Sequence, residues 1–243
     1  MRHVLTPTSY QDQQQRRSDK LSATLDFLAG EQWSTLDMLA DMLSVSRRNA
    51  GRVVAALERE GAVVADPLVI TDARRLIKIN ILGITGHGQA LAGRWDVQEY
   101  QRGQVSPHFA MHHLATQQAR LAAEAAGWRD WAAGKSLYGK GFKKVPDALV
   151  TSPAGQRIAI EIERNVKSPK RYAEAMVAAI SDIRQKRFDV VHYISPAGQQ
   201  ALIERAQAKV TVLHFKGEVI PTVVEQKHRL RFLFFSLDAW PPK

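Results

Sequence analysis

The chain has 243 residues, a length typical of one large domain or two modest domains. It contains no cysteine, which excludes disulfides, thiol nucleophiles and cysteine-based metal sites and favours a cytoplasmic protein. No apolar run approaches the ~20 residues needed to span a bilayer. The polar start of the chain also lacks the apolar segment of a signal peptide. We therefore expect no membrane insertion and no secretion.

The charge of the chain favours a polyanionic partner. The sequence holds 34 Lys and Arg against 24 Asp and Glu, a formal net charge of +10 at pH 7. Residues 1–100 hold 12 basic and 12 acidic side chains, so the whole excess lies in residues 101–243. This excess is typical of proteins that bind nucleic acid, ahead of anionic membranes. A generically basic protein without such a partner has the same composition.

The first hundred residues have the pattern of a winged helix-turn-helix domain, which we place at residues 18–100 after a mobile arm over residues 1–17. Leucines at helical spacing predict a first helix that Gly30 ends. Ser34 is the expected N-cap of a second helix. A third helix is predicted from Arg47 to Glu60, after a short turn. Three helices in this arrangement are typical of the helix-turn-helix motif.

A predicted β-hairpin follows the three helices and supports this interpretation. Two strand-like runs, residues 63–70 and 76–82, are separated by a polar turn and would form the wing. Basic side chains of the third helix lie opposite its apolar stripe, on the face that enters the major groove of DNA in this motif. The alternative is that these side chains only solvate an exposed helix face. The residues predicted to contact DNA here are Arg47, Arg48, Asn49, Arg52, Arg74 and Arg75.

Strand and helix patterns alternate in the rest of the chain, which predicts a mixed-sheet α/β domain over residues 106–243. The predicted helices span residues 113–126, 169–186 and 196–206, and the predicted strands span residues 145–150, 158–163, 190–195, 210–215 and 230–237. A loop rich in glycine and lysine precedes the first of these strands. Its Lys140, Lys143 and Lys144 are further candidates for contacting DNA phosphates.

The most informative strand carries two carboxylates. Side chains alternate between the two faces of a strand, so Glu161 and Glu163 share a face, roughly 6–7 Å apart. An antiparallel neighbour would bring Asp147 beside Glu161. A hard divalent cation, Mg²⁺ or Mn²⁺, would relieve the repulsion among these carboxylates, and we predict that all three hold it. The alternative is an edge strand with a solvated acidic face.

The segments P-D-A-L-V, A-I-E-I-E-R-N and K-S-P-K-R-Y, between Pro146 and Tyr172, resemble the replication–relaxation superfamily. Its members join a winged helix to a PD-(D/E)xK-like nuclease core, so the expected fold class is α+β or α/β with a mixed sheet. More narrowly, the chain resembles the MobC relaxases of the MOBC class. The resemblance implies metal-dependent nicking of one strand of plasmid DNA at the transfer origin. It also implies an accessory mobilisation protein, a coupling ATPase.

The resemblance assigns roles to individual residues. Asp147 matches the aspartate of the PD element, and Glu161 matches the first acid of (D/E)xK. Glu163 occupies the position where the general pattern has lysine, which puts the identity of the cationic group in doubt. Lys167 and Lys170, near the start of the following helix, and Lys144 from the basic loop are the candidates to replace it.

Two further residues are candidates for the catalytic site. Tyr172 would act as a nucleophile or a phosphate contact, with a tyrosine packed between helix and sheet as the alternative. His113, at the start of a predicted helix, would face the site. The leading hypothesis is a DNA-nicking relaxase, and the alternative is a winged-helix regulator of plasmid replication or transcription without catalytic activity.

Overall fold

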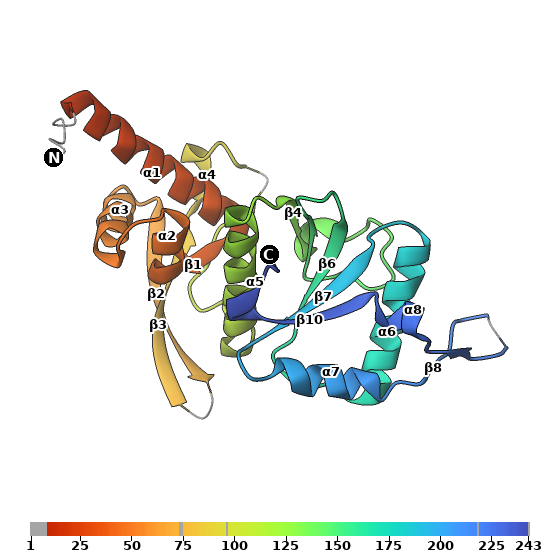
Figure 1. Cartoon of the computed structure of the whole chain (residues 1–243). Helices are drawn as coiled ribbons and strands as arrows, with labels where there is room; N and C mark the ends of the chain where they lie inside the picture. The colour runs from red at the N-terminus through yellow and green to blue at the C-terminus, as the bar shows by residue number, and fades with distance from the viewer. Residues whose placement is uncertain (1–8, 73–74, 96, 218, 243) are drawn as a thin grey trace, which may run out of the picture. The chain divides into compact units, whose positions relative to one another are not determined.

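The computed structural model describes residues 9–72, 75–95, 97–217 and 219–242. The chain divides into two compact units, Met1–Leu114 and Ala115–Lys243 (Figure 1). The division falls inside helix α5 (Pro107–Ala125), which begins before the predicted start at residue 113. The two units are described in turn.

Helix α1 (Tyr10–Glu31) corrects the prediction of a mobile arm over residues 1–17. Residues 1–8 lie outside the described part, but residues 10–17 form the first turns of α1. Ser9 and Asp12 form a capping box that fixes the start of the helix. The polar stretch that follows is exposed and stabilised along the helix, where Gln15 donates a hydrogen bond of 2.7 Å to Asp19.

The next two helices lie where the sequence predicts them. Helices α2 (Leu36–Met42) and α3 (Arg47–Arg59) are separated by a short turn, and the hydroxyl of Ser46 caps α3. Gly61 ends α3 with a φ of 70°. The amides of Gly61 and Ala62 donate to the carbonyls of Glu58 and Leu57, the two bonds of a Schellman motif.

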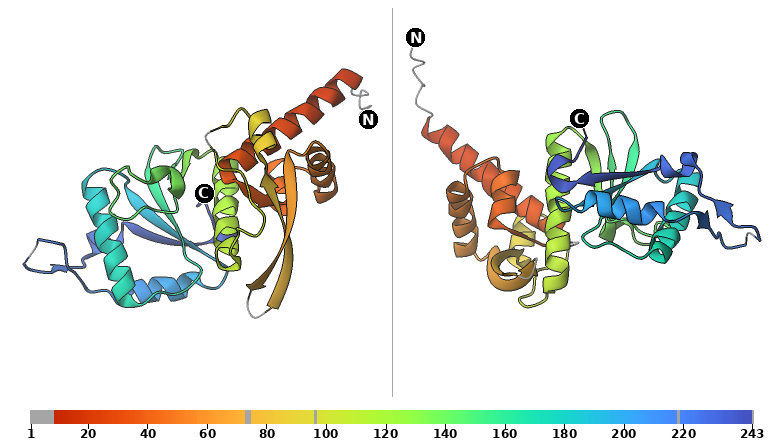
Figure 2. Two further views of the ribbon diagram at one scale, coloured as in Figure 1. Left: turned by 180° about the vertical axis from the view of Figure 1, so that it is seen from behind. Right: turned by 60° about the horizontal axis from the view of Figure 1, so that its bottom comes forward.

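The first unit contains a three-stranded antiparallel sheet in the order β1-β3-β2. Its strands are β1 (Trp33–Thr35), β2 (Val63–Asp72) and β3 (Arg75–Ile84), and β2 and β3 form the predicted hairpin, which extends away from the helices (Figures 1 and 2). Strand β1 was not predicted. Ser34, expected to cap the second helix, pairs in this strand with Leu82 instead.

The segment after the hairpin contains a short helix and a fixed stretch of chain. Helix α4 (Gly86–Leu91) begins at Thr85, whose hydroxyl accepts from the amide of Gly88. The hydroxyl of Tyr100 donates a hydrogen bond of 2.7 Å to Asp66, and the amide of Gly103 donates to the same carboxylate oxygen. This carboxylate therefore holds the segment after α4 against strand β2.

The second unit is built on a five-stranded mixed sheet in the order β10-β7-β6-β5-β4. Strand β6 runs parallel to β7 and antiparallel to β5, and β10 is parallel to β7. The strands are β4 (Arg129–Ala133), β5 (Ala148–Thr151), β6 (Arg157–Ile162), β7 (Val190–Ser195) and β10 (Phe232–Ser236). The mixed sheet confirms the predicted α+β or α/β class.

Helices cover both faces of this sheet (Figures 1 and 2). One core packs Ile158, Ile160 and Ile162 of β6 against α5. The other core packs the opposite face of the sheet against α6 (Pro169–Arg184) and α7 (Gln200–Ala208). The remaining elements are α8 (Gln226–Arg229), β8 (Val212–Leu213), β9 (Thr222–Val223) and two 3₁₀ turns, Gly134–Leu137 and Leu237–Ala239.

The position of β6 excludes one of the two hypotheses for its acidic residues. It is the central strand of the sheet, and Ala159 on the acidic face is buried in the core that includes α6. The alternative of an edge strand with a solvated acidic face is therefore wrong. Among the described residues, no helix is long and apolar enough to cross a membrane.

Candidate functional site

Asp147 and Glu161 lie side by side at the junction of β5 and β6. Ala148 pairs with Ile160 in the antiparallel register, so the preceding Asp147 lies opposite Glu161, as predicted. The amide of Asp147 donates to the carbonyl of Ile160 at 3.0 Å. The Asp147 carboxylate accepts a hydrogen bond of 2.7 Å from the amide of Ile162. Backbone pairing therefore fixes the aspartate next to the glutamate.

Glu161 is a largely buried carboxylate beside a second acid, and lysine side chains counter its charge. Its side chain is only 13% exposed. Burial raises the pKa of Glu161 above its ordinary value, the nearby charge of Asp147 raises this pKa further, and Lys144 and Lys167 oppose the shift. Carboxylate oxygens are the donors that Mg²⁺ and Mn²⁺ prefer, and binding of a divalent cation by these two acids stays a prediction.

Two of the three candidate lysines contact the acids. The Lys144 ammonium forms an ion pair with Glu161, and the Lys167 ammonium lies 2.5 Å from a carboxylate oxygen of Glu163. Lys170 is exposed in the first turn of α6. Lys144, on the loop before β5, therefore supplies a positive charge next to Asp147 and Glu161. The general nuclease pattern would instead have its lysine at position 163, which is a glutamate here.

Glu163 lies just beyond the end of β6 and is 4% exposed. Its amide donates to the carbonyl of Ile194 on β7, and its carboxylate is paired with Lys167. In the part of the chain that the structure describes, no three His, Asp or Glu residues form a group that could hold a metal ion. Metal binding by all three acids therefore stays a prediction, and the geometry favours Asp147 and Glu161.

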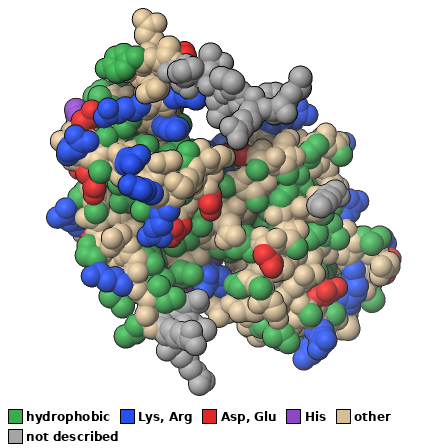
Figure 3. Space-filling model, turned by 60° about the vertical axis from the view of Figure 1, so that its left-hand side comes forward, with side chains coloured by type: hydrophobic (Ala, Val, Ile, Leu, Met, Phe, Trp, Pro, Cys, Tyr) green, Lys and Arg blue, Asp and Glu red, His purple; other side chains and the backbone are tan. Residues whose placement is uncertain are grey.

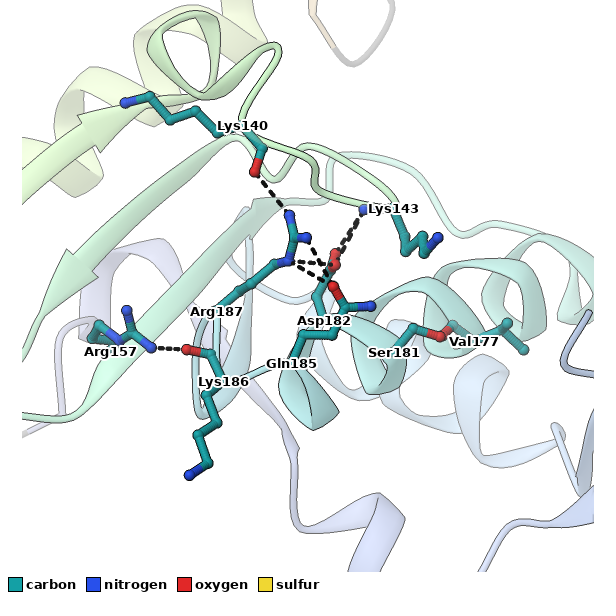
Figure 4. A network of polar contacts seen from close by, with 9 residues as sticks. All are labelled: Lys140, Lys143, Arg157, Val177, Ser181, Asp182, Gln185, Lys186 and Arg187. Carbon is teal, nitrogen blue, oxygen red and sulfur yellow. Dashed lines mark hydrogen bonds and ion pairs between the residues drawn. The ribbon is translucent and has the colours of Figure 1, made fainter.

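A buried network that we did not predict anchors the loop that carries Lys144 (Figure 4). Asp182 of α6 is fully buried, and both its carboxylate oxygens accept from the amide of Lys143, at 3.2 and 3.0 Å. The Arg187 guanidinium lies 3.5 Å from Asp182, donates to the carbonyl of Lys140 at 2.9 Å and covers the ring of Phe142. The side chains of Lys140 and Lys143 remain exposed.

Asp182→Ala is expected to lower the free energy of unfolding by about 2–3 kcal/mol, because it leaves Arg187 and a backbone amide without their buried acceptor. Urea denaturation measures the loss. Glu174→Ala, which removes an exposed carboxylate from the same helix, is the control and should change the stability by less than about 0.5 kcal/mol. Equal stability of the two variants would show that the network does not anchor the loop.

Tyr172 is a packed tyrosine, which corrects its prediction as a nucleophile or phosphate contact. It is 0% exposed, its ring meets Tyr193 edge to face at 6.3 Å, and its hydroxyl accepts from the amide of Lys167. Burial raises the pKa of Tyr172. Both effects oppose attack on a phosphodiester, and the hydroxyl instead positions the segment that carries Lys167.

His113 belongs to the first unit, whereas the acids belong to the second. Its ring packs on Trp33 with 4.4 Å between the ring centroids. Its Nε2 lies 3.3 Å from the carbonyl of Trp33 and 3.8 Å from the buried carboxylate of Glu31. These contacts lie within the first unit, and the catalytic role of His113 stays a prediction.

The predicted DNA contacts of the first unit lie on the exposed side of α3. Arg48, Asn49 and Arg52 are exposed, while Arg47 forms an ion pair with Asp37 of α2. This pairing partly neutralises Arg47, so the other three are the stronger candidates. The predicted contact at Arg74 and the side chain of Arg75 lie outside the described residues.

The fold and the site define a protein in which a helix-and-hairpin unit precedes a mixed-sheet unit with paired carboxylates on its central strands. A family model described as replication-relaxation matches residues 25–186. Because this match covers more than half of the chain, the protein belongs to the replication-relaxation family, which points to a role in plasmid replication or mobilisation. No curated protein and no solved structure matches the chain.

Proposed function

We propose that the protein is a relaxase of the MOBC class that nicks one strand of plasmid DNA at the transfer origin with a divalent metal. The observation that supports this best is the pair Asp147 and Glu161, fixed by backbone pairing beside Lys144. Plasmid DNA as substrate implies that the protein acts in the cytoplasm, with a coupling ATPase as its accessory mobilisation protein.

Each residue of the site has a role in this proposal. Asp147 and Glu161 hold the metal, Mg²⁺ or Mn²⁺, whose contribution is to polarise the phosphodiester and to lower the pKa of a bound water. Lys144 neutralises charge on the scissile phosphate, because its ammonium already lies at the carboxylates and its side chain is 41% exposed. Lys167 neutralises Glu163 and keeps it from adding a third negative charge.

The first unit supplies the contact with the transfer origin in this proposal. The exposed Arg48, Asn49 and Arg52 are presented by α3, the helix that enters the major groove in helix-turn-helix proteins. Arginine and asparagine are the side chains that most often read guanine and adenine edges there. The exposed Lys140 and Lys143 of the second unit add sequence-independent phosphate contacts.

The alternative function is a DNA-binding regulator without catalytic activity. It is favoured by the glutamate at position 163, and by the fact that Lys144 and Lys167 are both engaged in ion pairs with the acids. In such a protein the lysines would simply neutralise buried carboxylates. The two functions differ in what the protein does to supercoiled DNA.

Incubation of the protein with a supercoiled plasmid that carries its transfer origin tests the proposal. We expect open-circular product in Mg²⁺ or Mn²⁺, none after chelation with EDTA, and none from a plasmid without the origin. A mobility-shift measurement on the same samples reports binding. Retention of the origin DNA without any nicked product, in either metal, would support the regulator and overturn the nicking proposal.

A further inference from the structure

A groove of about 520 Å³ lies between α1 and α3 of the first unit. Arg16, Arg17 and Lys20 of α1 line one side of it, and Arg52 and Arg59 of α3 line the other. Arg16 and Arg17 belong to the stretch that the sequence predicted to be a mobile arm, and Lys20 belongs to the first predicted helix. Their helical conformation is what places them opposite α3.

The charge of this groove is uncompensated. Five of its lining side chains are cations and none is Asp or Glu. Across the residues that the structure describes, these five make no ion pair with a carboxylate. Figure 3 shows many Lys and Arg side chains together on the face that the first unit turns to the viewer. Cations held this close repel one another, and an anionic ligand would relieve that repulsion.

The groove also has an apolar component. Leu21 of α1 and Val53 and Ala56 of α3 line it together with the cations. A ligand that matches this surface combines negative charges with less polar groups between them. The sugar-phosphate backbone of DNA has this chemistry, because its phosphates alternate with sugars.

The position of the groove identifies which DNA it would bind. Asn49 and Arg52 line the groove and also belong to the surface of α3 that we propose reads the transfer origin. A duplex that contacts α3 through these side chains would bring its backbone to α1. Phosphate contacts of this kind fix the register of a protein on DNA without reading its sequence.

We propose that the groove between α1 and α3 binds the sugar-phosphate backbone of the duplex that α3 contacts. The inference rests on the DNA-binding half of the proposed function and does not depend on nicking. It gives α1 a role in affinity and orientation, and it leaves base recognition to α3.

Fluorescence anisotropy with a labelled origin duplex, over a series of salt concentrations, tests this inference. The groove variant combines Arg16→Gln, Arg17→Gln and Lys20→Gln, because glutamine keeps a high helix propensity. We expect at least roughly tenfold weaker binding near 0.1 M salt, and a slope of log K against log salt that is smaller by about 2–3. Circular dichroism confirms that the variant keeps its helix content.

The matched control removes the same charge from the second unit. Lys186→Gln, Arg205→Gln and Lys209→Gln change exposed side chains outside the groove, and this triple variant should bind the duplex nearly as the wild type does. Wild-type affinity and slope in the groove variant would overturn the inference. Intact DNA binding with lost binding to poly-glutamate would also overturn it and would indicate an acidic protein as the occupant.

The same samples separate this inference from the nicking proposal. If the wild-type protein cuts no plasmid in Mg²⁺ or Mn²⁺ while the groove variant still binds the duplex more weakly than the control, the catalytic proposal fails and the groove inference stands. If nicking is observed and the groove variant binds as the control does, the groove inference fails alone.

Discussion

Asp147→Asn is expected to reduce nicking of supercoiled origin plasmid by at least about 100-fold, the size of effect seen when one key electrostatic contact of a catalytic site is removed. Asparagine keeps an oxygen that can accept the hydrogen bond from the amide of Ile162, so the turn into β5 is preserved. What is lost is the negative charge opposite Glu161. The rate of open-circle formation in Mg²⁺ measures the effect.

Asp189→Asn is the matched control for this substitution. Asp189 accepts a hydrogen bond of 2.9 Å from the amide of Arg157, at the other end of the same strand β6. Each variant therefore loses one negative charge from a side chain that accepts a hydrogen bond from β6. Only the Asp147 substitution changes the paired carboxylates. Similar nicking rates in both would argue against Asp147 as a metal ligand. Duplex affinity should be nearly unchanged in both.

Lys144→Gln is expected to slow nicking at pH 7 by about 10- to 100-fold and to move the acidic limb of its pH profile to higher pH. Burial and Asp147 raise the pKa of Glu161, and Lys144 opposes them. Without Lys144 this pKa rises further, so a larger fraction of Glu161 is protonated at a given pH. Because only the carboxylate binds a cation well, activity would appear at higher pH than in the wild type.

Lys143→Gln provides the comparison, since it removes the neighbouring charge from the same loop while the backbone contact of Lys143 with Asp182 remains. Its pH profile should follow the wild type. Nicking rates measured from pH 5 to pH 9 at one fixed, subsaturating Mg²⁺ concentration distinguish the two variants. A profile of Lys144→Gln that coincides with the wild type would show that Lys144 does not control the ionisation of Glu161.

The elements around the acidic strand are the part of the fold that the sequence predicts best. Residues 158–163 and 190–195 were predicted as strands, and β6 and β7 have these bounds within one residue. Both are short apolar runs between polar segments, so their pattern is local and unambiguous. Helix α6 begins at residue 169, as predicted, with Ser168 as its N-cap and Pro169 in its first turn.

Features that depend on distant contacts could not be predicted in this way. Asp182 meets the amide of Lys143 across 39 residues, and Arg187 meets the carbonyl of Lys140 across 47, so no local pattern reveals either contact. The order of strands in the sheet is equally non-local, and for this reason the edge-strand hypothesis for β6 stayed open. Short strands such as β1, with three residues, are below the length at which alternation is recognisable.

The anchored loop before β5 has a consequence for how tightly an anion is bound near Glu161. Asp182 and Arg187 fix the backbone of residues 140 and 143 in the free protein. The loss of conformational entropy in this segment is therefore incurred during folding and not when a phosphate arrives. Only the exposed ends of the lysine side chains remain to be ordered, which favours tighter binding of an anion there.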